Sequence, residues 1–106
     1  MEAVRDFTDV RDSARAYWLA AISARPGEAY NLCTGRGVRI RELLDILLDE
    51  ASTDIDIRVD PERLRPSDVP WQVGDPSKLT EATGWAPEIP IRKTLVDLLG
   101  WWRSQT

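Results

Sequence analysis

Residues 28–59, EAYNLCTGRGVRIRELLDILLDEASTDIDIRV, are the stretch that decides the fold class. A short apolar run at residues 28–32 is typical of a buried strand. Residues 40–51 then carry apolar side chains at i, i+3, i+4, i+7, i+8 and i+11, the spacing of an amphipathic helix. Apolar and charged residues alternate over residues 55–59, as in a half-buried strand. A strand–helix–strand unit of this length favours parallel strands with a right-handed crossover, so the stretch predicts an α/β fold with a small, largely parallel sheet.

Helical patterns also flank this unit on both sides. Apolar residues recur at helical spacing over residues 10–23, and Asp9 is placed to cap that helix. A last helix is predicted over residues 91–104, and a shorter one between Pro76 and Gly84. With the helix at 40–51, which we expect to be core, the chain has three main helices.

The composition predicts one domain over residues 1–106 and excludes several classes of function. The net charge of −4 argues against nucleic acid as a partner. The absence of histidine excludes histidine-ligated metals and Ser-His-Asp catalysis, and no metal site is expected. With Cys33 as the only cysteine there is no intrachain disulfide. No apolar run is long enough for a membrane span or signal peptide, so we expect a cytoplasmic protein.

Residues 60–70 are the least core-like part of the chain and hold a candidate binding loop. Three prolines exclude a continuous helix there and favour an ordered loop. Arg65 and Asp68 lie three residues apart on either side of a proline-serine corner. An arginine fork suits phosphate and a carboxylate suits paired sugar hydroxyls. The alternative reading is a surface loop with a solvated ion pair.

Other motifs give weaker indications of function. Gly35-Arg36-Gly37 copies part of a dinucleotide-binding turn, but Ile40 occupies the third glycine position, which favours a plain turn. Neither Tyr17 nor Tyr30 is followed by lysine four residues later, so there is no catalytic Tyr-x-x-x-Lys pair.

Six segments in order carry a resemblance to a known family. The resemblance rests on RDFTDVRD at 5–12, YNLCTG at 30–35, IREL at 40–43, RPSD at 65–68, GDPSK at 74–78 and GWAP at 84–87. Together they resemble the carboxy-terminal, substrate-binding part of extended short-chain dehydrogenase/reductases (the NAD-dependent epimerase/dehydratase family). The likeness is greatest to the GDP-mannose 4,6-dehydratase and GDP-6-deoxy-mannose reductase group. It covers nearly the whole chain.

The resemblance implies a binding role without catalytic residues. Arg5 and Arg65 would contact the substrate diphosphate, Asp68 would bind the nucleotide ribose, and Arg63 would lie nearby. Family members bind NAD(P) in an amino-terminal Rossmann domain, which this sequence lacks, so no cofactor is expected in this chain. Arg39 stands where the family usually has a capping serine or threonine.

Three functional hypotheses remain open at this stage. The first is a truncated, catalytically incompetent subdomain that binds a GDP-mannose-type nucleotide sugar weakly. The second is a stand-alone interaction module that retains the fold, and the third is one half of a split enzyme. The apolar face that would dock on a Rossmann domain also predicts self-association, with a two-fold dimer as the simplest form.

Overall fold

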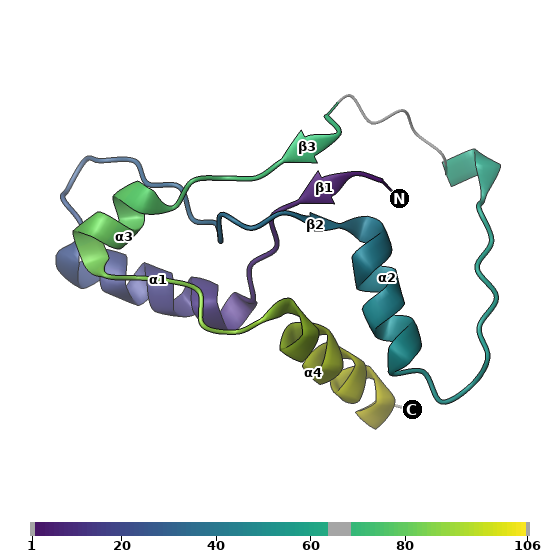
Figure 1. Cartoon of the computed structure of the whole chain (residues 1–106). Coiled ribbons are helices and arrows are strands. Elements are labelled where there is room, and N and C mark those ends of the chain that lie inside the picture. Colours follow the sequence, from purple (N-terminus) through teal and green to yellow (C-terminus); the bar gives the residue numbers. More distant parts are fainter. Residues whose placement is uncertain (1, 64–68, 106) are drawn as a thin grey trace.

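The computed structural model describes residues 2–63 and 69–105 and confirms the α/β class. The elements, labelled in Figure 1, run in the order β1 (Val4–Arg5), α1 (Val10–Ser23), β2 (Val38–Arg39), α2 (Ile40–Asp49), the 3-10 turn η1 (Pro61–Arg63), β3 (Trp71–Gln72), α3 (Ser77–Thr83) and α4 (Ile91–Ser104). The helices predicted at 10–23 and 91–104 have the expected bounds. Helix α2 ends two residues earlier than predicted.

The sheet has three strands in the order β2-β1-β3 and is mixed, so the prediction of a largely parallel sheet is wrong. Strand β1 pairs antiparallel with β2 and parallel with β3. Each strand has only two residues, and Arg5 of β1 lies opposite Val38 on one side and Gln72 on the other. The sheet is therefore small, and it joins three segments that are far apart in the sequence.

Neither of the strands predicted at 28–32 and 55–59 forms, and the parallel crossover between them is also wrong. A strand exists only where a neighbour accepts and donates its backbone hydrogen bonds. Within the described residues, no backbone ladder joins either segment to another one. The alternating pattern at 55–59 thus marks a segment that can pair but has no strand beside it among residues 2–63 and 69–105.

The tightest packing lies around Trp85, which is fully buried between α1 and α3. Ala16 and Leu79 contact it, and partly buried Tyr30 and Leu32 pack against the same cluster. The indole Nε1–H donates to the Asp12 carbonyl at 2.9 Å. Gly84 precedes Trp85 with φ 76°, a left-handed conformation that glycine adopts without strain and that ends α3.

Helix α1 turns its main apolar stripe outward. Tyr17 is 72% exposed and Trp18 67% exposed, and Val10 and Ile22 are also exposed. The face that the chain buries instead carries Asp12 and Ala16. The pattern therefore predicts the helix, but a different face of it is buried within this chain.

Helix α2 has the regular leucine pattern but no buried residue, so the prediction that its stripe is core is wrong for this chain. Among the described elements, α4 and β2 contact it, and its leucines stay half-buried. Arg39 makes no capping side-chain bond, and the Ile40 amide instead donates to the Ala3 carbonyl at 3.1 Å. A backbone contact from the segment preceding β1 thus replaces the missing cap.

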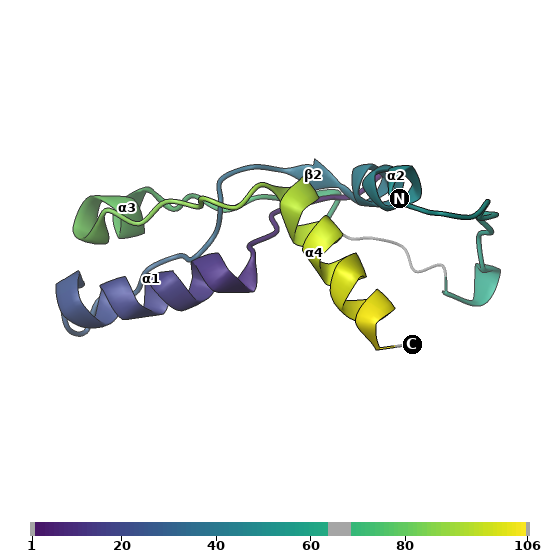
Figure 2. The same ribbon diagram turned by 90° about the horizontal axis from the view of Figure 1, so that it is seen from below.

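The molecule is thin and open for its size. Figure 2 shows α2, α3 and the sheet in one layer, with α1 and α4 below it. The radius of gyration is 16.7 Å, against about 13 Å for a compact domain of this length. The accessible surface is 8177 Å², against about 6,000 Å² for a compact protein of this mass. Among the described residues, no helix is long and apolar enough to cross a membrane.

Candidate functional site

The structure places two of the four predicted site residues. Arg5 lies in β1, where its Nη1 donates to the Val4 carbonyl at 2.8 Å. The Arg63 side chain is 87% exposed in η1, with its Nε 3.5 Å from Asp60 Oδ2. Figure 1 shows η1, which contains Arg63, beyond α2 and away from β1, which contains Arg5. Arg65 and Asp68 lie outside the described residues, and their roles stay predictions.

One residue beyond Arg5, the Asp6 carboxylate organises the edge of the sheet. It accepts hydrogen bonds from the Thr34 amide at 2.8 Å, the Thr34 hydroxyl at 2.6 Å and the Gly35 amide at 2.9 Å. A fourth, from the Gly74 amide, is 3.3 Å long. Burial alone would raise the pKa of Asp6, but these hydrogen bonds together hold the pKa below its usual value. The carboxylate thereby fixes the turn after residue 33 to the segment after β3.

This arrangement does not fit a dinucleotide-binding turn at residues 34–37. Such a turn needs free backbone amides that face a pyrophosphate, and the Thr34 and Gly35 amides are already bonded to Asp6. A Cβ at Gly37 would lie 2.5 Å from Val4 Cγ1, so this glycine serves close packing against β1. The residues present in this turn therefore do not form a site for NAD(P).

Two more aspartates, Asp9 and Asp12, follow Asp6 at intervals of three residues. Asp9 connects α1 to α4, and Asp12 connects α1 to the segment before α4. Asp9 accepts from the Arg11 amide and guanidinium and from the Thr94 hydroxyl of α4 at 2.6 Å. The bond from Arg11 holds the pKa of Asp9 far below its ordinary value, against the effect of burial. Asp12 accepts from the Glu88 and Ile89 amides at 3.1–3.2 Å.

Sequence reasoning identified only the capping role of Asp9. The signal for the rest is the Asp-x-x-Asp-x-x-Asp spacing in residues 6–12 of the motif RDFTDVRD. Asp6, Asp9 and Asp12 each bind a different distant segment, and we call these three residues the aspartate clamp. The aspartates of the family-like segment RDFTDVRD are therefore mainly structural in this chain.

Next to the clamp is a cleft of about 460 Å³ lined by Phe7, Thr34, Arg36, Val38 and residues 87–91. Its volume is in the range of small-molecule sites. Arg36 and Glu88 give it one charge of each sign. Sequence reasoning missed Arg36, because the residues around it were interpreted as a plain turn. Within the described part of the chain, no three acidic or cysteine side chains gather where they could hold a metal.

Comparison with known proteins gives consistent matches. The sequence profile of the family described as GDP-mannose 4,6 dehydratase matches residues 1–98. GDP-6-deoxy-D-mannose reductase of Pseudomonas aeruginosa is 36% identical over 105 residues, covering 99% of this chain and 34% of that enzyme. GDP-mannose 4,6-dehydratase of Yersinia enterocolitica is 26% identical, covering 93% of this chain and 34% of that enzyme.

Solved structures match along the same length. RMD from Pseudomonas aeruginosa, in complex with NADPH, superposes with a TM-score of 0.92 at 35% identity, covering 99% of this chain and 34% of that one. A UDP-glucose 4-epimerase from Thermotoga maritima, solved with UDP-glucose, has a TM-score of 0.87 at 30% identity, covering 98% and 33%. The chain thus spans about a third of the length of the proteins it matches.

Proposed function

Because this chain belongs to the GDP-mannose 4,6-dehydratase family of extended short-chain dehydrogenase/reductases, we propose that it is the nucleotide-sugar-binding part of a sugar dehydratase or reductase. The observation that carries the proposal is the match of nearly the whole chain to one third of a GDP-6-deoxy-D-mannose reductase. The substrate class is a GDP-mannose-type nucleotide sugar.

In the proposed complex, Arg5 and Arg65 bind the diphosphate and Asp68 binds the ribose. The fourth candidate, Arg63, belongs to η1, which lies away from β1 in this structure, so it is not assigned a contact. Arginine suits this role because its planar fork bonds two phosphate oxygens at once. Binding by this chain alone is weak, because a site open on one side leaves water to compete for each contact. We expect a dissociation constant for GDP on the order of 0.1–10 mM.

Titration with GDP followed by NMR chemical shifts tests this proposal. Arg65→Ala removes most of the binding, since a charge-assisted contact contributes roughly 1.5–3 kcal/mol. Arg65→Lys restores only part of it. Asp68→Ala weakens GDP binding and leaves pyrophosphate binding unchanged. Arg41→Ala, which removes an exposed arginine paired with Asp45, is the matched control and leaves binding unchanged. No shift at millimolar GDP contradicts the proposal.

We further propose that the chain alone neither binds NAD(P) nor turns over substrate. Relatives are solved with NADPH or NAD bound, but in the turn at residues 34–37 the Thr34 and Gly35 amides donate to Asp6 and the Arg36 amide donates to the Thr34 hydroxyl. The chain also lacks a Tyr-x-x-x-Lys pair to move a proton. Saturable NADP binding in calorimetry, or reductase turnover above background, would refute this.

A second candidate is one half of a split enzyme or a stand-alone interaction module, and the outward stripe of α1 favours it. Four large apolar side chains, Val10, Tyr17, Trp18 and Ile22, form an exposed face that suits a docking partner. In the split-enzyme form, the partner is a cofactor-binding chain with a glycine-rich turn and a Tyr-x-x-x-Lys pair. Mixing this chain with such a partner should give turnover that Trp18→Glu abolishes, while Val59→Glu, on a different exposed surface, retains it. No turnover in the mixture would rule out the split-enzyme form.

A further inference from the structure

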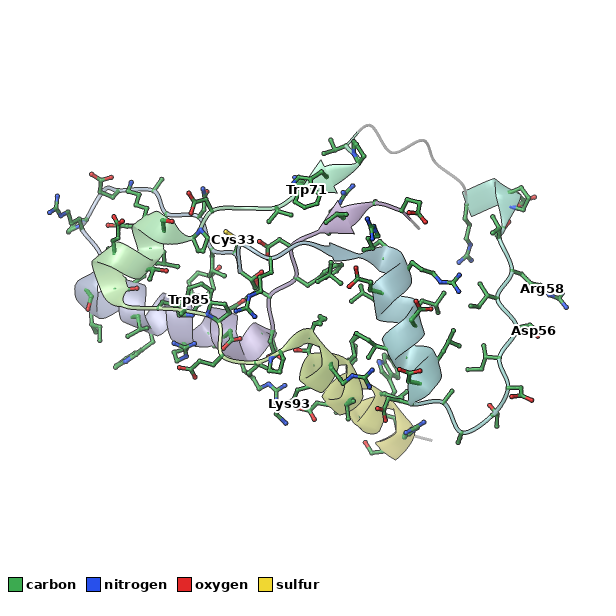
Figure 3. The ribbon with its side chains drawn as sticks, in the orientation of Figure 1. Cys33, Asp56, Arg58, Trp71, Trp85 and Lys93 are labelled. Carbon is green, nitrogen blue, oxygen red and sulfur yellow. The ribbon has the colours of Figure 1, made fainter. Side chains whose placement is uncertain are left out.

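The segment 55–59 combines exposed apolar side chains with a backbone that is not paired with any other described segment. Ile55, Ile57 and Val59 are exposed. Within the described residues, the backbone groups of 55–59 make no hydrogen bond. Figure 1 shows the segment as an extended trace along the outer edge, beyond α2. In Figure 3, Asp56 and Arg58 point away from the body of the molecule. An extended edge of this kind is a template for strand addition.

The sequence of this segment is complementary to itself when read in the opposite direction. In an antiparallel pair centred on Ile57, Asp56 lies opposite Arg58 of the second copy, and Arg58 lies opposite its Asp56. Ile55 lies opposite Val59 of the second copy, and Ile57 faces its own equivalent on the axis. Two opposite-charge pairs and three apolar pairs are the cross-strand combinations that stabilise a sheet.

We propose that a second copy of this chain adds to this edge, forming a two-fold antiparallel strand pair over residues 55–59. The closed two-fold symmetry pairs one edge of each strand with the same edge of the other copy, so the assembly at that edge stops at two chains. The ladder ends where Asp54 meets Asp60 of the second copy, because two carboxylates then lie opposite each other. Asp60 also accepts from the Glu62 amide within its own chain.

The apolar side of the strand pair continues an existing groove. Side chains alternate along a strand, so Ile55, Ile57 and Val59 share one face. Ile55 already lines a groove of about 330 Å³ between α2 and α4, together with Leu44, Leu47, Leu48 and Leu99. Pairing sets Val59 of the second copy beside Ile55 and so extends this apolar surface.

Charge reversal at the two polar positions tests the proposal by sedimentation velocity. The wild type should associate reversibly and weakly, with a dissociation constant on the order of 10–100 µM. Asp56→Arg and Arg58→Asp each place two like-charged pairs across the axis and should weaken association about tenfold. The double variant restores opposite charges and should recover wild-type association. A monomeric wild type, or a double variant as weak as the single ones, would overturn the proposal.

Cysteine cross-linking tests the register, in a Cys33→Ser background. Ile57→Cys places two sulfurs at the axis, where opposed Cα atoms lie about 4.5–5.5 Å apart, within disulfide range. Ile55→Cys is the matched control, since its two copies lie about 13 Å apart in this register. Mild oxidation should therefore cross-link the first variant and not the second. Equal cross-linking of both would refute the antiparallel register.

Discussion

The region around Trp85 and the region formed by α2 and α4 reach their folds in different ways. The first has a modest apolar pattern, yet it contains the fully buried tryptophan and the aspartate clamp. The second has the most regular leucine stripe of the chain, yet α2 buries none of its residues. Ion pairs of Arg92 with Asp49 and Glu50 join its two helices at the surface. Apolar periodicity thus indicates which face needs a cover, whereas specific polar contacts decide which segments come together.

Of the variants that compare the two regions, Trp85→Ala should lose the most stability. The change removes a fully buried indole, its bond to the Asp12 carbonyl and a contact with the Arg15 guanidinium 6.0 Å from the ring centroid. We expect a loss of about 3–5 kcal/mol in the free energy of unfolding, enough to unfold a marginal domain. Trp71→Ala, at a tryptophan that is 63% exposed, should cost less than about 1 kcal/mol in urea denaturation. Similar losses of stability for Trp85→Ala and Trp71→Ala would contradict the assignment of the core to Trp85.

Asp12→Ala should cause the next largest loss in the free energy of unfolding, because it leaves two amides of the segment before α4 without their acceptor. The Glu88 and Ile89 amides both donate to this buried carboxylate, and Arg15 lies 3.2 Å from it. We expect a loss of about 2–3 kcal/mol. Asp45→Ala is the control, because it removes an exposed carboxylate that pairs with Arg41 four residues away. It should cost less than about 0.5 kcal/mol.

Acid should destabilise the clamp, and the direction follows from the lowered pKa values. The folded-state pKa values of Asp6 and Asp9 lie below their unfolded values near 4, so the stabilisation is fully present above that pH. It is lost as the pH falls through the folded-state pKa values. Asp9→Asn should lower the stability at neutral pH and flatten its decline below about pH 4. An unchanged pH dependence in this variant would show that the clamp does not carry the effect.

The smallest loss of stability should come from a change in the region formed by α2 and α4. Leu47→Ala removes a half-buried side chain from the groove between α2 and α4 and should cost about 1 kcal/mol. Leu79→Ala, at a leucine that is 3% exposed beside Trp85, should cost about 2–5 kcal/mol. Thermal unfolding of the pair measures the difference directly, and a larger cost for Leu47→Ala would reverse the comparison.

The sequence predicts the helices well because their signals are local. Periodicity locates α1 and α4, and the left-handed glycine at position 84 marks the end of α3. The sheet could not be predicted, since its two-residue strands have no pattern of their own and depend on which segments meet. The predicted strands failed for the complementary reason: a pattern typical of a strand does not supply a neighbour.

The candidate site shows the same division between local and distant signals. The family resemblance finds Arg5 and the loop at 60–70, but not Arg36 in the cleft or the partners of Asp6 and Asp12. Those partners lie 28 or more positions away in the sequence, at Thr34 and Ile89 for example. No local pattern specifies a contact at such a distance. Arg65 and Asp68 lie outside the described residues, so their role depends on the binding experiments.

Native-state hydrogen exchange at micromolar concentration tests the central claim most directly, because it reports the opening free energy of each region separately. Amides of α1 and α3 beside Trp85 should exchange only when the protein unfolds globally, and so should have the highest opening free energies. Amides of α2 should exchange through smaller openings, and those of 55–59 should exchange nearly as fast as in an unfolded chain. Equal protection of α1 and α2, or strong protection of residues 55–59 in a monomeric sample, would contradict the account.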